Sequence, residues 1–187
     1  MNINLVAQDI PLQTFIAWGD IENKKILEDL KSDALKQIAN SDGKLNYKTN
    51  VKGKMTDWQS LANSPSLKNF IYSIKDEIKL IHTKSFILKE AWANLLKKDD
   101  KVRGHNHRGS IGAFCGIIYL SDQGPGTFFK ELNFLLPEKT GRYVLFHPLL
   151  FHEVKKIEND IERLTIAFNC HEVLEWEKVE GTDIYEL

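Results

Sequence analysis

The spacing of hydrophobic residues predicts helices in the first half of the chain. Between residues 20 and 40, apolar side chains recur every three or four positions, which places them on one face of a helix. We expect Asp20 to cap this helix and Asn40 to end it. The apolar face consists of Ile26, Leu27, Leu30, Ala34, Leu35 and Ile38. Residues 41–57 are polar and contain glycine, so we expect a long loop there.

A second apolar face predicts another helix that begins near Ser64-Pro65. Proline is well tolerated in the first turn, because its missing N–H would have no partner there anyway. The apolar face of this helix consists of Leu67, Phe70, Ile71, Ile74, Ile78 and Ile81.

After Ser85 the pattern changes to short apolar or alternating runs, which predict strands. Glycine, proline, asparagine and aspartate separate these runs, and residues 96–104 form a polar segment between two of them. The predicted strands cover residues 86–95, 112–120, 127–135, 142–146, 149–154 and 163–170, and 173–179 adds a last candidate. Run 112–120 is almost wholly apolar, as expected for a strand that is covered on both faces.

Helices followed by many short strands predict an α+β fold in one domain. We expect residues 1–84 to form a helical N-terminal layer of the same domain that contains residues 85–187. The number of strands in the second part favours a double-stranded β-helix, or jelly roll, with the helices packed on one of its sheets.

The composition of the chain argues against several classes of protein. The 187 residues are 42% hydrophobic and 27% charged, which argues against a disordered chain. Lys and Arg number 25 against 26 Asp and Glu, so no basic excess indicates nucleic acid as the main partner. The start of the sequence does not resemble a signal peptide, and no run is long and apolar enough to span a membrane. Two cysteines without a CxxC pair fit a reducing compartment, so we expect a cytoplasmic protein.

Four of the six histidines fall between residues 105 and 152, and three of them predict a metal site. His105 and His107 are two positions apart, so in an extended chain they point to the same side. His152, from a later strand, is the natural third ligand. Neutral imidazoles suit iron, zinc, copper and nickel.

The other three histidines fit structural roles. His147 precedes Pro148 at a predicted strand end, where we expect it to support the neighbouring strand. His82 and His171 are expected to be satisfied core residues.

Arg163 opens a strand in which it shares one face with Thr165 and Ala167. A cavity-facing guanidinium can hold a carboxylate with two parallel donors, and the hydroxyl of Thr165 can assist. The alternatives are an arginine that points to water or one that pairs with Glu162 or Asp160.

Tyr119 shares a strand face with Cys115 and Ile117. If that face lines the interior of the β core, its hydroxyl needs a partner there. A ligand carboxylate or a backbone carbonyl would serve.

In this order, these residues resemble the 2-oxoglutarate- and Fe(II)-dependent oxygenases, especially the prolyl-hydroxylase-like members and those of phages and marine bacteria. The resemblance spans about residues 85–170 and rests on six short motifs. They are His105-Asn106-His107, Ile117-Ile118-Tyr119-Leu120, Gly124-Pro125-Gly126-Thr127, the segment from Pro137 to Gly141, His152-Glu153-Val154 and Arg163-Leu164-Thr165.

The resemblance implies Fe(II) and 2-oxoglutarate as cofactors. It makes His152 the distal iron ligand and lets Arg163 hold the far carboxylate of 2-oxoglutarate, with Thr165 and Tyr119 assisting. The reaction would consume dioxygen and couple the decarboxylation of 2-oxoglutarate to succinate with oxidation of a substrate, usually its hydroxylation. A cytoplasmic location would then be in a bacterial cell or a phage-infected host, while the primary substrate and the oligomeric state stay open.

One position departs from the family pattern, because His107 stands where the family has a carboxylate ligand. Direct ligation by His107 needs no further assumption, and we expect it. A carboxylate such as Asp122 or Glu131 is a second solution, and a water molecule with His107 beside it is a third.

Two other functions fit the same residues. A cupin-like metal-dependent dioxygenase or metal-binding protein would use three histidines without 2-oxoglutarate. A non-catalytic binding module with a chance histidine cluster is the other.

Overall fold

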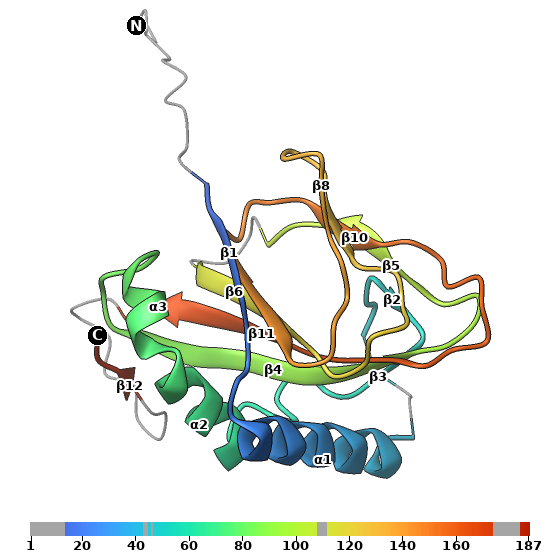
Figure 1. Ribbon diagram of the computed structural model, residues 1–187, viewed down its shortest axis with the longest axis horizontal. Coiled ribbons are helices and arrows are strands. Elements are labelled where there is room, and N and C mark those ends of the chain that lie inside the picture. Colours follow the sequence, from blue (N-terminus) through green and yellow to red (C-terminus); the bar gives the residue numbers. More distant parts are fainter. Residues whose placement is uncertain (1–13, 43–44, 46, 108–111, 174–183) are drawn as a thin grey trace, which may run out of the picture.

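Two antiparallel β-sheets face each other, and the helices pack on the outer side of the larger one (Figure 1). The computed structural model describes residues 14–42, 45, 47–107, 112–173 and 184–187. The expected helices and many short strands are confirmed, with the helices packed on one sheet, and the pairing of the strands is antiparallel. None of the helices within the described residues is long and apolar enough to cross a membrane.

The larger sheet follows the strand order β1-β9-β6-β11-β4-β12 within the described residues, and β3 also pairs with β4. Its strands are β1 (Ile16–Asp20), β3 (Lys54–Met55), β4 (Phe86–Leu96), β6 (Gly112–Tyr119), β9 (Arg142–Phe146), β11 (Arg163–Glu172) and β12 (Ile184–Tyr185). The central strand β11 pairs along most of its length with β4 on one side and β6 on the other.

The smaller sheet follows the order β2-β5-β10-β7-β8. Its strands are short: β2 (Val51–Lys52), β5 (Lys101–His105), β7 (Thr127–Phe129), β8 (Phe134–Leu136) and β10 (His152–Val154). Strand β10 pairs with both β5 and β7, which brings the end of β5 next to the start of β10.

The first helix, α1 (Lys24–Asn40), begins three residues later than expected. The side chain of Asn23 caps it by accepting hydrogen bonds from the backbone N–H groups of Lys25 and Ile26. Asp20 instead ends β1, opposite Arg142, and its carboxylate pairs with the Arg142 side chain at 3.2 Å. Pairing with Arg142 on a distant strand therefore places Asp20 in β1, although the local sequence predicts it to be a helix cap.

The second helical stretch begins as expected but is not continuous. Ser64 caps α2 (Pro65–Ser73). The backbone leaves the helical conformation at Ile74 (φ −111°, ψ 22°), and α3 (Lys75–Lys79) follows. The apolar spacing continues through the break because Ile74 and Ile78 are both buried in the same core.

Several predicted loops and strands need correction. The expected loop 41–57 contains β2 and β3, and the polar segment 96–104 contains most of β5. The expected strand 127–135 is a hairpin of β7 and β8, with Asn133 in the left-handed conformation between them (φ 46°). Strand β10 covers only the last three residues of 149–154. Apart from Val173, the expected strand 173–179 lies outside the described residues.

Alternate residues of β11 face different layers, as the sequence pattern predicts. Leu164 and Ile166 belong to the core that joins the larger sheet to the helices, together with Leu30 of α1 and Phe70 of α2. Arg163, Thr165 and Ala167 face the smaller sheet instead and line a cavity between the two sheets. The same alternation in β6 places Tyr119, with Cys115 and Ile117, on the side between the sheets.

Candidate active site

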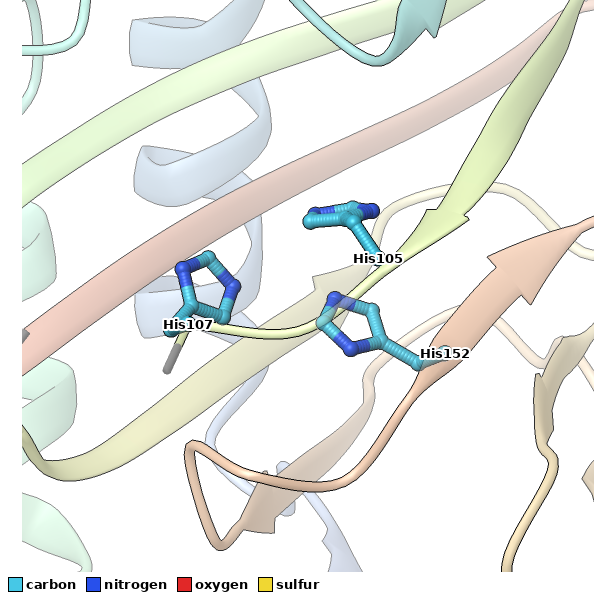
Figure 2. Close-up of side chains that lie close together, drawn as sticks. All are labelled: His105, His107 and His152. Atoms are coloured by element: carbon cyan, nitrogen blue, oxygen red, sulfur yellow. The ribbon is translucent and has the colours of Figure 1, made fainter. Parts of the chain in front are cut away.

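Three histidines converge in the cavity between the sheets. His105 ends β5, His107 follows two residues later, and His152 begins β10. Each offers one ring nitrogen, and these three atoms all lie within 4.8 Å of one another (Figure 2). This spacing suits three ligands around one metal ion.

Backbone carbonyls orient two of the rings. His105 Nδ1 lies 2.8 Å from the carbonyl oxygen of Arg103, and His152 Nδ1 lies 3.0 Å from that of Leu150. A hydrogen bond at Nδ1 fixes the tautomer and leaves Nε2 with its lone pair free for a cation. The backbone N–H of His107 donates to the Pro148 carbonyl at 2.8 Å, which holds the segment after β5 against the turn before β10.

Burial keeps the three rings neutral. It lowers the pKa of His152 to about 3 and that of His107 to about 4, with repulsion between the neighbouring imidazoles as a smaller cause. Burial also lowers the pKa of His105. Neutral imidazole is the form that binds a metal, so the donor set fits Fe(II) as well as zinc.

The alternative carboxylates lie elsewhere. Asp122 is exposed in the turn after β6. Glu131 is exposed, and its Oε2 accepts the backbone N–H of Phe151 at 2.9 Å. Among the described residues that line the cavity, His107 is present, and Asp122 and Glu131 are not. Ligation by His107 itself stays a prediction.

The cavity has a volume of about 190 Å³. The histidines line it from the smaller sheet, and Thr165 and Ala167 line it from β11. Trp92 and Asn94 of β4 extend the wall beside β11. Arg163 and Thr127 also line the cavity, and both are buried, with 2% and 0% of their surface exposed.

Arg163 points into the protein and not to water. Its Nε–H donates to the Pro125 carbonyl at 3.2 Å, and Nη2 lies 3.5 Å from the Thr127 hydroxyl. Its acidic neighbour is Glu138, whose Oε2 lies 3.0 Å from Nε. The expected alternative partner Glu162 instead pairs with Lys97 at 2.7 Å on the surface.

Tyr119 reaches this end of the cavity only through Thr127. Its hydroxyl donates to Thr127 Oγ1 at 2.7 Å, and its ring centroid lies 5.4 Å from the Arg163 guanidinium carbon. Burial raises the pKa of Tyr119, which keeps the hydroxyl protonated as a donor. Thr127, not Tyr119, carries the hydroxyl of this pair that lines the cavity.

Sequence reasoning missed Thr127, Glu138 and Asn94 as site residues. Thr127 and Glu138 fall within motifs of the family resemblance, but their contacts with Arg163 join residues 36 and 25 positions apart. Asn94 lies opposite Thr165 in the β4–β11 register, which places its side chain on the cavity face. Only the tertiary arrangement identifies these neighbours.

The remaining histidines lie outside this group. His147 supports the strand end as expected, because its N–H donates to the Phe15 carbonyl and its Nδ1 accepts the Leu149 N–H. His82 packs against the rings of Phe86 and Phe114. His171 lies near the end of β11, opposite Ile87 of β4.

No protein family model matches the chain, and its sequence matches no curated protein. Its fold nevertheless resembles that of several solved structures. The viral collagen prolyl hydroxylase vCPH from Paramecium Bursaria Chlorella virus-1, solved with 2-oxoglutarate, is 15% identical over 84% of this chain and 96% of its own, with a TM-score of 0.58. A prolyl-4-hydroxylase from Pseudomonas putida is 13% identical over 84% and 92%, with a TM-score of 0.62.

HygX from Streptomyces hygroscopicus, solved with nickel and 2-oxoglutarate bound, is 13% identical and has a TM-score of 0.61. The similarity covers 89% of this chain and 86% of HygX. At these identities the comparison establishes the fold. The chain therefore has the fold of the viral and bacterial prolyl hydroxylases and of HygX.

Proposed function

We propose that the protein is a 2-oxoglutarate- and Fe(II)-dependent oxygenase, most simply a hydroxylase, whose two sheets form a double-stranded β-helix. One observation carries this proposal: three neutral imidazoles converge in a cavity that also contains a buried arginine. Two of the solved structures with the same fold contain 2-oxoglutarate, which supports the choice of cosubstrate.

In this proposal, His105, His107 and His152 hold the iron. Arg163 holds the far carboxylate of 2-oxoglutarate, with the hydroxyls of Thr127 and Thr165 beside it. When bound, iron and 2-oxoglutarate supply the oxidising chemistry, in which dioxygen is consumed, 2-oxoglutarate is decarboxylated to succinate and the substrate is oxidised. The chain positions both groups and keeps bulk water from the site.

Tyr119 has a supporting role in this arrangement. Its O–H is donated to Thr127, so the Thr127 hydroxyl keeps its own hydrogen free to donate to a ligand carboxylate. Tyr119 thereby orients a donor without touching the ligand.

A cupin-like metal-dependent dioxygenase or metal-binding protein that does not use 2-oxoglutarate is the second candidate. Two observations favour it: no carboxylate joins the three histidines among the described residues, and Glu138 already balances the charge of Arg163. Zinc or iron would fit such a site.

One experiment separates the two functions. We expect the protein with Fe(II) and 2-oxoglutarate, kept free of oxygen, to show a visible metal-to-ligand charge-transfer band. Arg163→Ala should lose the band at moderate 2-oxoglutarate concentration and still bind iron. Arg142→Ala is the matched control, because Arg142 pairs with Asp20 away from the cavity. If the folded, iron-loaded wild-type protein shows no band, the 2-oxoglutarate-dependent function is excluded and the second candidate is favoured.

We also propose that residues 1–84 and 85–187 belong to one domain. Leu30 and Ala34 of α1 support this, because they lie in the same core as Ile166 and Phe168 of β11. A cytoplasmic location is proposed as well, and the two free, buried thiols of Cys115 and Cys170 support a reducing compartment.

A further inference from the structure

Glu138 places a carboxylate against Arg163, the residue to which the proposed function assigns the far end of 2-oxoglutarate. The side chain of Glu138 is 0% exposed and that of Arg163 is 2% exposed. Glu138 Oε2 lies 3.0 Å from Arg163 Nε. The two charges therefore meet with almost no water between or around them.

Within the described residues, only one of the two carboxylate oxygens of Glu138 accepts a hydrogen bond. Oε1 accepts the Ser121 hydroxyl, and Ser121 in turn accepts the backbone N–H of Leu164 at 2.8 Å. Oε2 has no hydrogen-bond donor among the described residues. A buried carboxylate in this state is costly unless a positive charge is adjacent, and Arg163 is that charge.

A glycine turn closes over the ion pair. A Cβ atom at Gly124 would lie 2.5 Å from Glu138 Oε2 and 2.9 Å from Arg163 Cδ, so only glycine fits there without a shift. The next residue, Pro125, accepts the Nε–H of Arg163 through its carbonyl. The turn thus excludes water and holds the guanidinium by its Nε side.

This arrangement leaves the Nη side of Arg163 for a ligand. Nη2 points toward Thr127, and both residues line the cavity. A ligand carboxylate would meet these donors, but it would also meet an arginine whose charge Glu138 has already balanced. In a buried site, a second carboxylate gains less from a balanced arginine than from an unbalanced one.

We propose that Glu138 is a specificity-determining residue for 2-oxo acids: it balances Arg163 in the ligand-free cavity and so limits how strongly the site prefers a dicarboxylic over a monocarboxylic 2-oxo acid. This rests on the proposed function, and it concerns selectivity and not catalysis. Glu138 acts through Arg163, so it is a positioning residue.

The test compares two acids of equal chain length. 2-Oxoglutarate and 2-oxovalerate both have five carbons, and only the first has a far carboxylate. Dissociation constants for both are measured with the oxygen-free Fe(II) protein by titrating the charge-transfer band. In Glu138→Gln, only the far carboxylate of 2-oxoglutarate can balance the buried guanidinium, so we expect the ratio of the two constants to rise about tenfold or more in its favour.

Two variants accompany the test. Glu162→Gln removes an acid next to Arg163 in sequence, but one that is exposed and paired with Lys97, so its ratio should equal that of the wild type. Glu138→Asp keeps the charge and should stay much closer to the wild-type ratio than Glu138→Gln. If the glutamine variant does not fold, Glu138→Ala serves in its place with the same expected rise.

The outcomes separate the two proposals. A wild-type protein that gives no band with either acid defeats the proposed function. A wild-type protein that binds 2-oxoglutarate, with an unchanged or smaller ratio in the folded Glu138 variant, defeats the role of Glu138 alone.

Discussion

His152 lies directly opposite His105 in the antiparallel pairing of β10 with β5. Their ring centroids are 4.4 Å apart, and the ring of His107 lies 5.3 Å from that of His105 and 5.4 Å from that of His152. Backbone pairing therefore brings together side chains that are 47 positions apart in the sequence (152 − 105). The histidines of the candidate metal site come together only if these two strands pair in this register.

Substitution of His107 tests whether three histidines or two hold the metal. We expect His107→Ala to weaken Fe(II) binding by more than the roughly 10–100-fold that is lost with a residue that only supports a ligand, because here a direct ligand is lost. His107→Asp should retain binding, since it supplies an oxygen ligand. Calorimetric titration with Fe(II) or Mn(II) measures both. His82→Ala is the histidine control, because His82 packs among aromatic rings away from the site. Full affinity in His107→Ala would show that His107 is not a ligand.

The buried ion pair predicts strongly non-additive effects on stability. Arg163→Ala leaves the carboxylate of Glu138 buried without a counter-charge, which we expect to cost about 3–5 kcal/mol of unfolding free energy. The double variant with Glu138→Ala should lose much less than the sum of the two single variants. Urea unfolding of all four proteins measures the coupling. Additive losses would mean that the two side chains contribute independently.

Removal of hydroxyl groups distinguishes Thr127 from Tyr119. We expect Thr127→Val to weaken 2-oxoglutarate binding more than Tyr119→Phe, because only Thr127 lines the cavity. Tyr119→Phe should cost about 1 kcal/mol of stability for its lost hydrogen bond, and its ligand affinity should fall only a few-fold. Tyr72→Phe, on an exposed ring, is the control. The opposite order of the two affinities would place the Tyr119 hydroxyl on the ligand.

Acid should destabilise the metal-free protein through the site histidines. The pKa of His152 is lowered to about 3 and that of His107 to about 4, from an ordinary value of 6.5. Between these values the unfolded chain binds more protons than the folded one, so stability is full above pH 6.5 and falls as the pH drops toward 4. Each histidine contributes a slope of about 1.4 kcal/mol per pH unit within this window. Urea unfolding from pH 7 to pH 4.5 measures the slope.

Replacement of one histidine provides the check on that pH dependence. His107→Gln should reduce the slope by the contribution of one group. An equal slope in this variant would assign the pH dependence to other residues.

Local sequence determined much of the secondary structure and, for several site residues, which side of a strand each side chain is on. Apolar spacing located α1 and α2, and strand alternation assigned Arg163 and Thr165 to the face between the sheets, because periodicity depends only on near neighbours. The His105-Asn106-His107 spacing indicated a shared direction for the same reason. Local signals were wrong at Asp20 and across 127–135, where pairing with β9 and the β7–β8 hairpin decide the conformation.

Only the tertiary structure decided which distant groups meet. The register of β10 on β5 brings His152 to His105, and the packing of the Gly124 turn and of the segment after β8 brings Glu138 to Arg163. No local rule contains this information, because these contacts depend on how strands far apart in the sequence pair and on what the two sheets enclose. The sequence by itself determined which chemical groups are available, and the burial that the fold imposes decided their partners, their charge states and the side of Arg163 that is left for a ligand.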